Sequence, residues 1–192
     1  HPLWYSPYLP LYFFVSSMFA GLSMVIFEGS LSHRYFHHKM DATHLKEAEH
    51  VVYGFAKGAS FIMAGYFAIK VFGISLDNNW HYLGTGYGMW YLVELLGFVA
   101  LPSFLFALGV RERKSKLIRW TAAWTVLGII VNRFNVSLVA FNWQLPLSQR
   151  YFPSWMEIVI SLFIVTIGVL VFRFMVTRMP VLFEHPDYKG SH

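Results

Sequence analysis

Five apolar runs, each roughly twenty residues or longer, divide this chain, and charged residues stand in short islands between them. A helix needs roughly 20 apolar residues to cross a hydrocarbon core. One such run also suits a buried core helix or a signal sequence, but five in succession do not. Only 13% of the residues are charged, against about a quarter in soluble domains. The pattern predicts an all-α membrane protein with about five transmembrane helices.

The predicted spans are separated by polar turns, prolines and charges. They cover approximately residues 9–31, 45–72, 87–110, 117–141 and 154–176, and we expect them to form a single transmembrane bundle over residues 1–192. Pro180 ends the last helical pattern, because proline lacks the N–H that a helix needs. A short polar tail over residues 177–192 follows.

Lys and Arg lie mainly on one side of this topology. That side holds Arg34, Lys39, Lys46, Arg111, Arg113, Lys114, Lys116, Arg119, Arg173, Arg178 and Lys189. The other side holds Lys70 and Arg150, while Lys57 and Arg133 fall inside spans. The positive-inside rule then predicts a cytoplasmic tail and a periplasmic amino terminus, which suits one half of a longer subunit. The same rule explains the formal net charge of +5 better than nucleic-acid binding does.

Tryptophan is typical of the two membrane–water interfaces, because its ring is apolar and its N–H is polar. The tryptophans of this chain stand close to the predicted span ends. We expect an outer belt of Trp4, Trp80, Trp90, Trp143 and Trp155, with Trp120 at the inner interface.

Ionisable residues inside membrane spans are costly, so each is a candidate functional group. Glu94 in the third span and Arg133 in the fourth lie at similar depths, about 10–15 Å from the outer face at 1.5 Å of rise per residue. We expect them to pair, with Asn132 and Asn135 adding hydrogen bonds. These four residues, Glu94, Asn132, Arg133 and Asn135, indicate a proton relay or the wall of a quinone headgroup pocket. The alternative is an ion pair with a purely structural role. Pro102 is expected to kink the third span and to free backbone carbonyls near this group.

Four other positions are also candidates. Glu28, near the inner end of the first span, and Lys57 in the second form a possible pair for proton entry or exit. Alternatively, Lys57 extends its amine to the interface and Glu28 faces lipid headgroups. Lys57, Asn142 and Glu157 rank second. Glu157 lies three residues after Ser154 in an S-x-x-E pattern that predicts a helix cap.

The residue types limit which cofactors this chain can bind. It has no cysteine, which excludes iron–sulfur clusters and zinc sites bound by its own thiolates. Nine histidines suggest haem, but a bis-histidine haem needs facing histidines within the spans, and none lies in the middle third of a span. We therefore expect no metal and no haem, with His50 at the inner side as the remaining haem alternative.

Several motifs together resemble one known family. They are His1-Pro2-Leu3-Trp4, Val25-Ile26-Phe27-Glu28-Gly29-Ser30-Leu31, Ser137-Leu138-Val139-Ala140-Phe141-Asn142, and Tyr151-Phe152-Pro153-Ser154-Trp155 with Glu157. This set resembles the NrfD/polysulfide-reductase membrane family, and most of all its branch in respiratory NiFe hydrogenases, often labelled a b-type cytochrome. Glu94 and Arg133 fall where that branch carries a Glu and an Arg.

The resemblance implies the second four-helix bundle plus a final helix of an NrfD-like fold, hence a carboxy-terminal half, in the bacterial inner membrane. Such subunits exchange electrons with menaquinone or ubiquinone through an iron–sulfur, ferredoxin-like subunit. A hydrogenase, a multihaem cytochrome c or a molybdopterin enzyme lies beyond it. The family's quinone pocket is mainly in the first bundle, which leaves this chain a scaffold and a proton route. A structural membrane anchor for a periplasmic electron-transfer module and a haem-bearing cytochrome b are the alternatives.

Overall fold

The computed structural model describes residues 1–36 and 42–178. Over these residues the regular structure is entirely helical. Five helices are long and apolar enough to cross a membrane: Leu9–Leu31, Glu49–Leu76, Gly86–Arg111, Ser115–Asn142 and Trp155–Met175. They agree with the five predicted spans to within a few residues, which confirms the all-α membrane fold. Most of the predicted tail, with Lys189, lies outside the described residues, and so does Lys39.

The chain divides into two compact units, His1–Arg150 and Tyr151–His192. The second unit contains α7 (Trp155–Arg178), which begins as the S-x-x-E pattern predicts. The backbone N–H of Glu157 donates to Oγ of Ser154 at 3.4 Å. The Glu157 carboxylate accepts a hydrogen bond from the Tyr151 hydroxyl, and this bond raises the pKa of the Tyr151 phenol.

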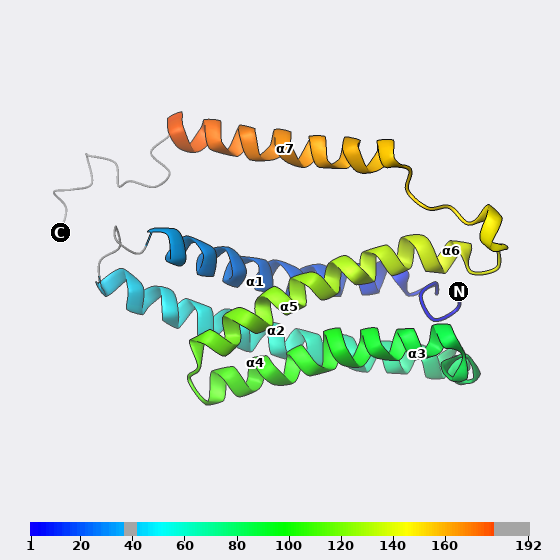
Figure 1. Ribbon diagram of the computed structural model, residues 1–192. Helices are drawn as coiled ribbons and strands as arrows, with labels where there is room; N and C mark the ends of the chain where they lie inside the picture. The colour runs from blue at the N-terminus through cyan, green and yellow to red at the C-terminus, as the bar shows by residue number, and fades with distance from the viewer. Residues whose placement is uncertain (37–41, 179–192) are drawn as a thin grey trace. The chain divides into compact units, whose positions relative to one another are not determined.

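Four antiparallel rods form the first unit (Figure 1). Two are uninterrupted helices, α1 (Leu9–Phe36) and α2 (Ala42–Leu76). The third consists of α3 (Gly86–Leu92), η3 (Val93–Ala100) and α4 (Leu101–Arg111), and the fourth of α5 (Ser115–Phe134), η4 (Asn135–Val139) and α6 (Ala140–Asn142). The short helices η2 (Asn79–Gly84) and η5 (Leu147–Gln149) lie in the connections. Helix α1 packs on α2 and α5, and α4 packs on the same two helices.

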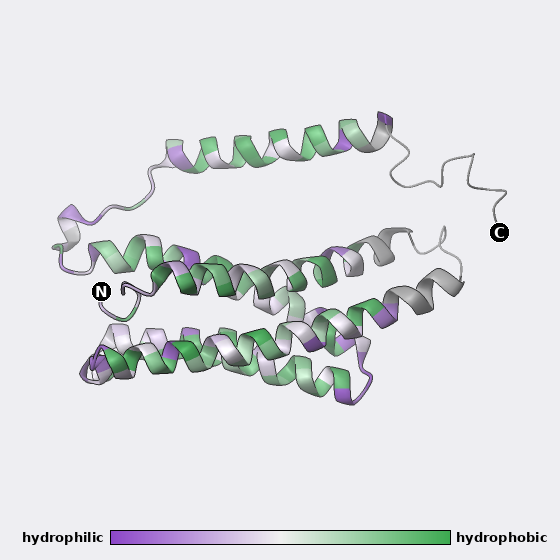
Figure 2. Ribbon diagram, turned by 180° about the vertical axis from the view of Figure 1, so that it is seen from behind, coloured by the Kyte–Doolittle hydropathy of each residue, from purple (hydrophilic) through white to green (hydrophobic). Residues whose placement is uncertain are grey.

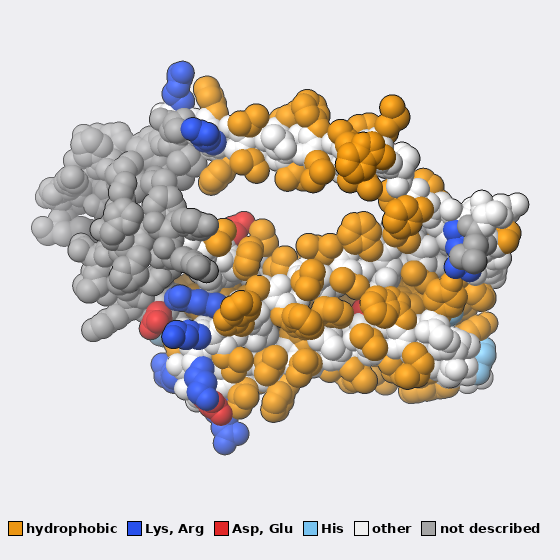
Figure 3. Space-filling model, viewed as in Figure 1, with side chains coloured by type: hydrophobic (Ala, Val, Ile, Leu, Met, Phe, Trp, Pro, Cys, Tyr) orange, Lys and Arg blue, Asp and Glu red, His pale blue; other side chains and the backbone are white. Residues whose placement is uncertain are grey.

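Many large apolar side chains on the rods are exposed, as they are in proteins that meet lipid. Figure 2 shows that hydrophobic residues predominate along the same helices. Figure 3, a view from the opposite side, shows hydrophobic side chains over the rods and Lys and Arg gathered at the turn between α4 and α5. The fully buried interior includes Trp4, Ile26, Met63, Phe106 and Ile118. Lipid supplies little hydrophobic force between helices, so close packing and interhelical hydrogen bonds must hold such a bundle together.

Two serines form a reciprocal pair between α2 and α4. Oγ of Ser60 donates to the carbonyl of Ser103 at 2.8 Å, and Oγ of Ser103 donates to the carbonyl of Ser60 at 2.9 Å. Small polar residues of this kind let two backbones approach closely in a membrane. The pair therefore fixes the third rod against the second within the bundle.

A glycine sets the spacing between α5 and η3. A Cβ at Gly128 would lie 2.7 Å from Cβ of Phe98, which is too close for either backbone to stay in place. We expect Gly128→Ala to lower the free energy of unfolding by about 1–3 kcal/mol, as overpacking does. Denaturant unfolding in mild detergent measures it. Gly65→Ala is the matched control, because a Cβ at Gly65 meets nothing within 4 Å. An equal loss in both variants would contradict this account of the crossing.

Candidate functional site at the buried carboxylate of Glu94

A π-helical segment places Glu94 in the bundle interior. In η3 the hydrogen bonds shift register, and the N–H of Leu101 donates to the carbonyl of Leu96, five residues back. Pro102 comes next and has no N–H, so the carbonyl of Gly97 lacks a donor in this register. The indole of Trp124 donates to that carbonyl at 2.9 Å. This indole contact is what a carbonyl released by Pro102 would attract, so it agrees with the prediction made from the sequence.

The Glu94 side chain is only 5% exposed, and three N–H groups donate to its carboxylate. Oε2 accepts from the indole of Trp4 at 2.9 Å and from the amide of Asn135 at 2.5 Å. Oε1 accepts from the amide of Asn132 at 2.5 Å. An ionised carboxylate has acceptors only, so all three contacts suit the charged form. Such charge-assisted bonds offset part of the cost of a carboxylate in a membrane interior.

A further contact orients the Asn135 amide. Its Oδ1 accepts a hydrogen bond from the Trp90 indole at 3.1 Å, which leaves the NH₂ group to face Glu94. Two tryptophans and two asparagines thus hold the carboxylate from the chain lead-in, α3, α5 and η4. The predicted neighbours Asn132 and Asn135 are brought together with Glu94.

Arg133 is placed differently from the prediction. Both Glu94 and Arg133 lie in the described part of the chain, and they do not form the expected ion pair. The guanidinium donates to Oγ of Ser16 at 2.8 Å and lies 3.8 Å from the ring centre of Phe13, both on α1. Successive helix residues are turned by about 100°, so Asn132 faces η3 while Arg133 faces α1. The asparagines take the position expected of the arginine.

Trp4 also corrects the sequence-based picture. It is 1% exposed and belongs to the core, whereas an interfacial belt residue would be half-exposed. The lead-in before α1 folds against the end of the bundle, where the His1 ring meets Trp4 and Trp143 edge-on. Trp80 and Trp90 are 49% and 43% exposed, as belt residues are. All of these tryptophans stand near a span end in the sequence. Their positions therefore did not show that Trp4 is a hydrogen-bond donor inside the bundle.

Lys70 is a functional candidate that the sequence analysis missed. It was assigned to the outer side, but α2 continues to Leu76 and Lys70 is 4% exposed. Its Nζ lies 4.2 Å from the ring centre of Tyr12, 5.6 Å from that of Tyr91 and 5.8 Å from that of Tyr66. Aromatic faces attract a cation, more strongly where water is excluded. The apolar residues after Lys70 were the signal that it lies inside the span.

A small cavity adjoins the Glu94 carboxylate. Among the residues that line it are Ser16, Tyr66, Phe98, Gly128 and Asn132. Its volume is about 20 Å³, enough for about one water molecule. Small-molecule sites occupy roughly 300–1,000 Å³. The cavity therefore has room for one water, and a quinone ring does not fit into it.

The remaining candidates neither hydrogen bond to Glu94 nor line its cavity. Glu28 and Lys57 are exposed, and no ion pair joins them. Asn142 ends α6, where its carbonyl accepts from the N–H of Leu145 at 3.1 Å. His50 is exposed on α2. Within residues 1–36 and 42–178, no three His, Cys, Asp or Glu side chains gather as metal ligands would.

Fold and site together define a multi-pass membrane protein with a hydrogen-bonded carboxylate in its interior. The chain belongs to the NrfD family, since the family model described as "Polysulphide reductase, NrfD" matches residues 1–142. The family expected from the sequence motifs is thereby confirmed. The matched residues end at Asn142 and contain Glu94 and its three hydrogen-bond donors, Trp4, Asn132 and Asn135, which we call the Glu94 group.

Two relatives extend the comparison over nearly the whole chain. A protein of Nitratidesulfovibrio vulgaris is 68% identical over 192 residues, which are 100% of this chain and 50% of that protein. The probable Ni/Fe-hydrogenase 2 b-type cytochrome subunit of Escherichia coli is 27% identical over 187 residues, 95% of this chain and 45% of that subunit. The chain thus spans about half the length of these relatives. No solved structure matches it.

Proposed function

We propose that this chain is part of the membrane subunit of a bacterial respiratory oxidoreductase complex that exchanges electrons with the quinone pool and provides a proton route. The observation that supports this proposal most directly is the Glu94 carboxylate. Three N–H groups donate to it inside a membrane bundle, beside a cavity with room for one water. Reduction of a quinone takes up two electrons and two protons. A membrane subunit of this kind therefore needs a group that can exchange protons.

The electrons come from another subunit in this proposal. The chain has no cysteine, so it cannot itself bind an iron–sulfur cluster through thiolates. An iron–sulfur, ferredoxin-like partner fills this role, and a hydrogenase, a multihaem cytochrome c or a molybdopterin enzyme lies beyond it. The names of the family and of the Escherichia coli relative refer to two different oxidoreductases, which favours a shared membrane module.

The quinone, menaquinone or ubiquinone, binds outside the two cavities beside Glu94 and Lys70. Neither cavity that adjoins a buried charge exceeds about 20 Å³, far less than a ring-sized ligand needs. The role left for Glu94, Asn132 and Asn135 is proton exchange through bound water. Glu28 and Arg133 stay in the proposal as further proton-route residues, with Lys57 second to them.

The proposed orientation puts the α4–α5 turn in the cytoplasm. Arg111, Arg113, Lys114 and Lys116 gather there (Figure 3). Since Lys70 is buried in the bundle, Arg150 alone remains of the two basic residues assigned to the opposite side. The positive-inside rule then places the amino-terminal lead-in on the periplasmic side of the inner membrane.

The test is the composition of the native complex. We expect extraction in mild detergent to yield this sequence together with an iron–sulfur subunit, with no haem b signal from the membrane subunit in a reduced-minus-oxidised spectrum. A haem b signal that disappears in His50→Ala would instead support the cytochrome alternative that the Escherichia coli relative's name suggests. An isolated subunit without redox partners would contradict the proposal.

A further inference from the structure

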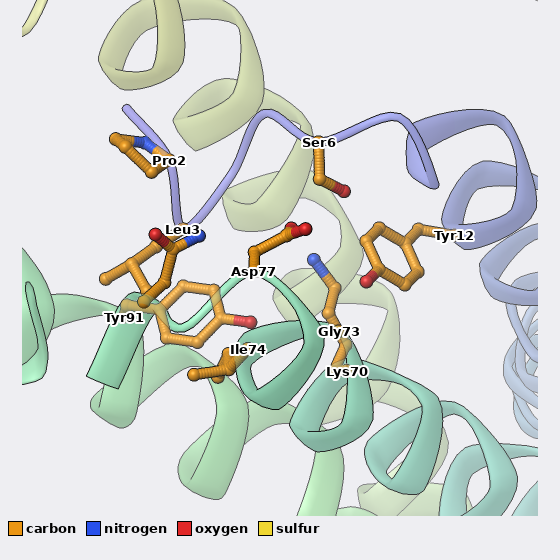
Figure 4. A pocket seen from close by; sticks show the side chains of 10 residues that line it. Pro2, Leu3, Ser6, Tyr12, Lys70, Gly73, Ile74, Asp77 and Tyr91 are labelled. Atoms are coloured by element: carbon orange, nitrogen blue, oxygen red, sulfur yellow. The ribbon is translucent and has the colours of Figure 1, made fainter.

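Lys70 stands between two cavities in the bundle. It lines one of them, together with Ser6, Tyr12, Asp77, Asn79 and Tyr91. Figure 4 shows its amine between the Asp77 carboxylate and the Tyr12 ring, at the end of α2 where Asp77 lies. Asp77 is exposed, whereas Lys70 is buried, so this cavity leads from a buried amine toward the aqueous surface.

The first cavity contains one buried polar atom that no described protein group satisfies. Oγ of Ser6 is buried without a hydrogen-bond partner among the described residues. Among the described residues, no carboxylate lies within salt-bridge distance of the Lys70 amine. The cavity volume is about 10 Å³, at the lower limit for a single water. One water there would satisfy the serine and link the amine to Asp77.

Tyr66 connects this cavity to the Glu94 site. Its buried ring faces the Lys70 amine, and the same residue lines the cavity beside Glu94. Tyr91 forms a second link, since it lines the Lys70 cavity and packs edge-on against Trp4, a donor to Glu94. The buried carboxylate and the buried amine are therefore separated by tyrosines and space for single waters.

We propose that Lys70 is a proton carrier between the Glu94 cavity and the aqueous surface at Asp77. The inference rests on the proposed function and extends it to a residue outside the Glu94 group. A lysine amine in an apolar interior can lose its proton, which arginine cannot do in proteins. The ammonium passes one proton through the cavity water to the Asp77 carboxylate and becomes a neutral amine. It then takes the next proton from the side of Glu94, and no electrons are transferred at Lys70.

The charged and titratable groups around Lys70 fit this role. Tyr12 faces it from α1, Tyr66 from its own helix and Tyr91 from α3. The negative charge of Glu94 on η3 attracts the Lys70 ammonium, and the positive charge of Arg133 on α5 repels it. Asp77 lies at the mouth of the cavity. Proton exchange at Lys70 thus depends on the buried carboxylate of Glu94 and on the half-buried guanidinium of Arg133.

The test compares Lys70→Arg, Lys70→Met and Asp77→Asn in the intact complex, reconstituted in liposomes with a pH-indicator dye. We expect quinone-linked proton movement to fall at least fivefold in both Lys70 variants and at least twofold in Asp77→Asn. Arginine at this position keeps the positive charge but cannot release a proton. If the charge of Lys70 had only a structural role, Lys70→Arg would therefore keep the wild-type rate of proton movement. Lys116→Arg, at the exposed α4–α5 turn, is the control.

Proton movement near the wild-type rate in Lys70→Arg or in Asp77→Asn would overturn the inference. Asp77 is exposed, so its variant is informative even if the Lys70 variants fold poorly. A wild-type complex that exchanges electrons with quinone without moving protons would overturn the role of Lys70 and leave the proposed function standing. A complex that exchanges no electrons with quinone would overturn both.

Discussion

In a Glu94→Gln complex we expect quinone-linked electron transfer to fall at least about tenfold, while the subunits stay assembled. Glutamine has the size of glutamate and keeps one oxygen for the donors, but it cannot take up and release a proton. Its NH₂ group faces a hydrogen-bond donor of Trp4, Asn132 or Asn135, which costs roughly 1–3 kcal/mol of stability. Turnover of the purified complex with a quinone analogue measures the first effect.

Glu112→Gln is the matched control for this prediction. Glu112 lies in the α4–α5 turn and forms an exposed pair with Lys114 at 2.5 Å. Surface pairs of this kind contribute about 0–1 kcal/mol, so we expect turnover and stability to stay at wild-type values. Unchanged turnover in Glu94→Gln would support the alternative that the chain is a structural anchor.

The second large effect is expected for Asn135→Asp. The exchange preserves shape but replaces the NH₂ donor, 2.5 Å from Oε2 of Glu94, by a second carboxylate. Two carboxylates in one buried site cannot both stay ionised at low cost. We expect the free energy of unfolding at neutral pH to drop by about 2–4 kcal/mol, from the lost hydrogen bond and the added repulsion.

The same variant has a defined pH dependence. At low pH one of the two carboxyls carries a proton and donates a hydrogen bond to the other, so the folded state favours protonation. The loss relative to wild type is therefore smallest in acid and grows as the pH rises. Denaturant unfolding between about pH 5 and pH 8 measures it. Asn78→Asp, at the exposed turn after α2, is the control, and a loss independent of pH in Asn135→Asp would contradict the account.

The spans and the polar residues of the third and fourth rods were predictable from sequence, because apolar length and embedded charge are local properties. The hydrogen-bond partners of Glu94 could not be predicted in this way. An ion pair is the simplest expectation for a buried Glu and a buried Arg at equal depth. The structure instead uses two amides and the Trp4 indole, because Asn132 rather than Arg133 faces η3 and because the lead-in folds against the bundle.

Lys70 and Trp4 show the limit of reading the end of a span from charge and aromatic residues alone. Both were assigned to the outer interface, where lysine and tryptophan are common. Lys70 is inside because three tyrosines from α1, α2 and α3 surround its amine. Trp4 is inside because the lead-in folds against the bundle. Both placements depend on contacts between segments far apart in the sequence.

The most direct test of the central claim is a redox titration of the intact complex in liposomes that contain menaquinone, with the iron–sulfur clusters followed by electron paramagnetic resonance. This measurement does not depend on the direction of electron flow. We predict that the oxidation state of the clusters follows the quinone-to-quinol ratio, and that a quinone-site inhibitor slows the approach to equilibrium. Clusters that do not respond to the quinone pool would contradict the proposal that this chain belongs to a quinone-linked membrane subunit.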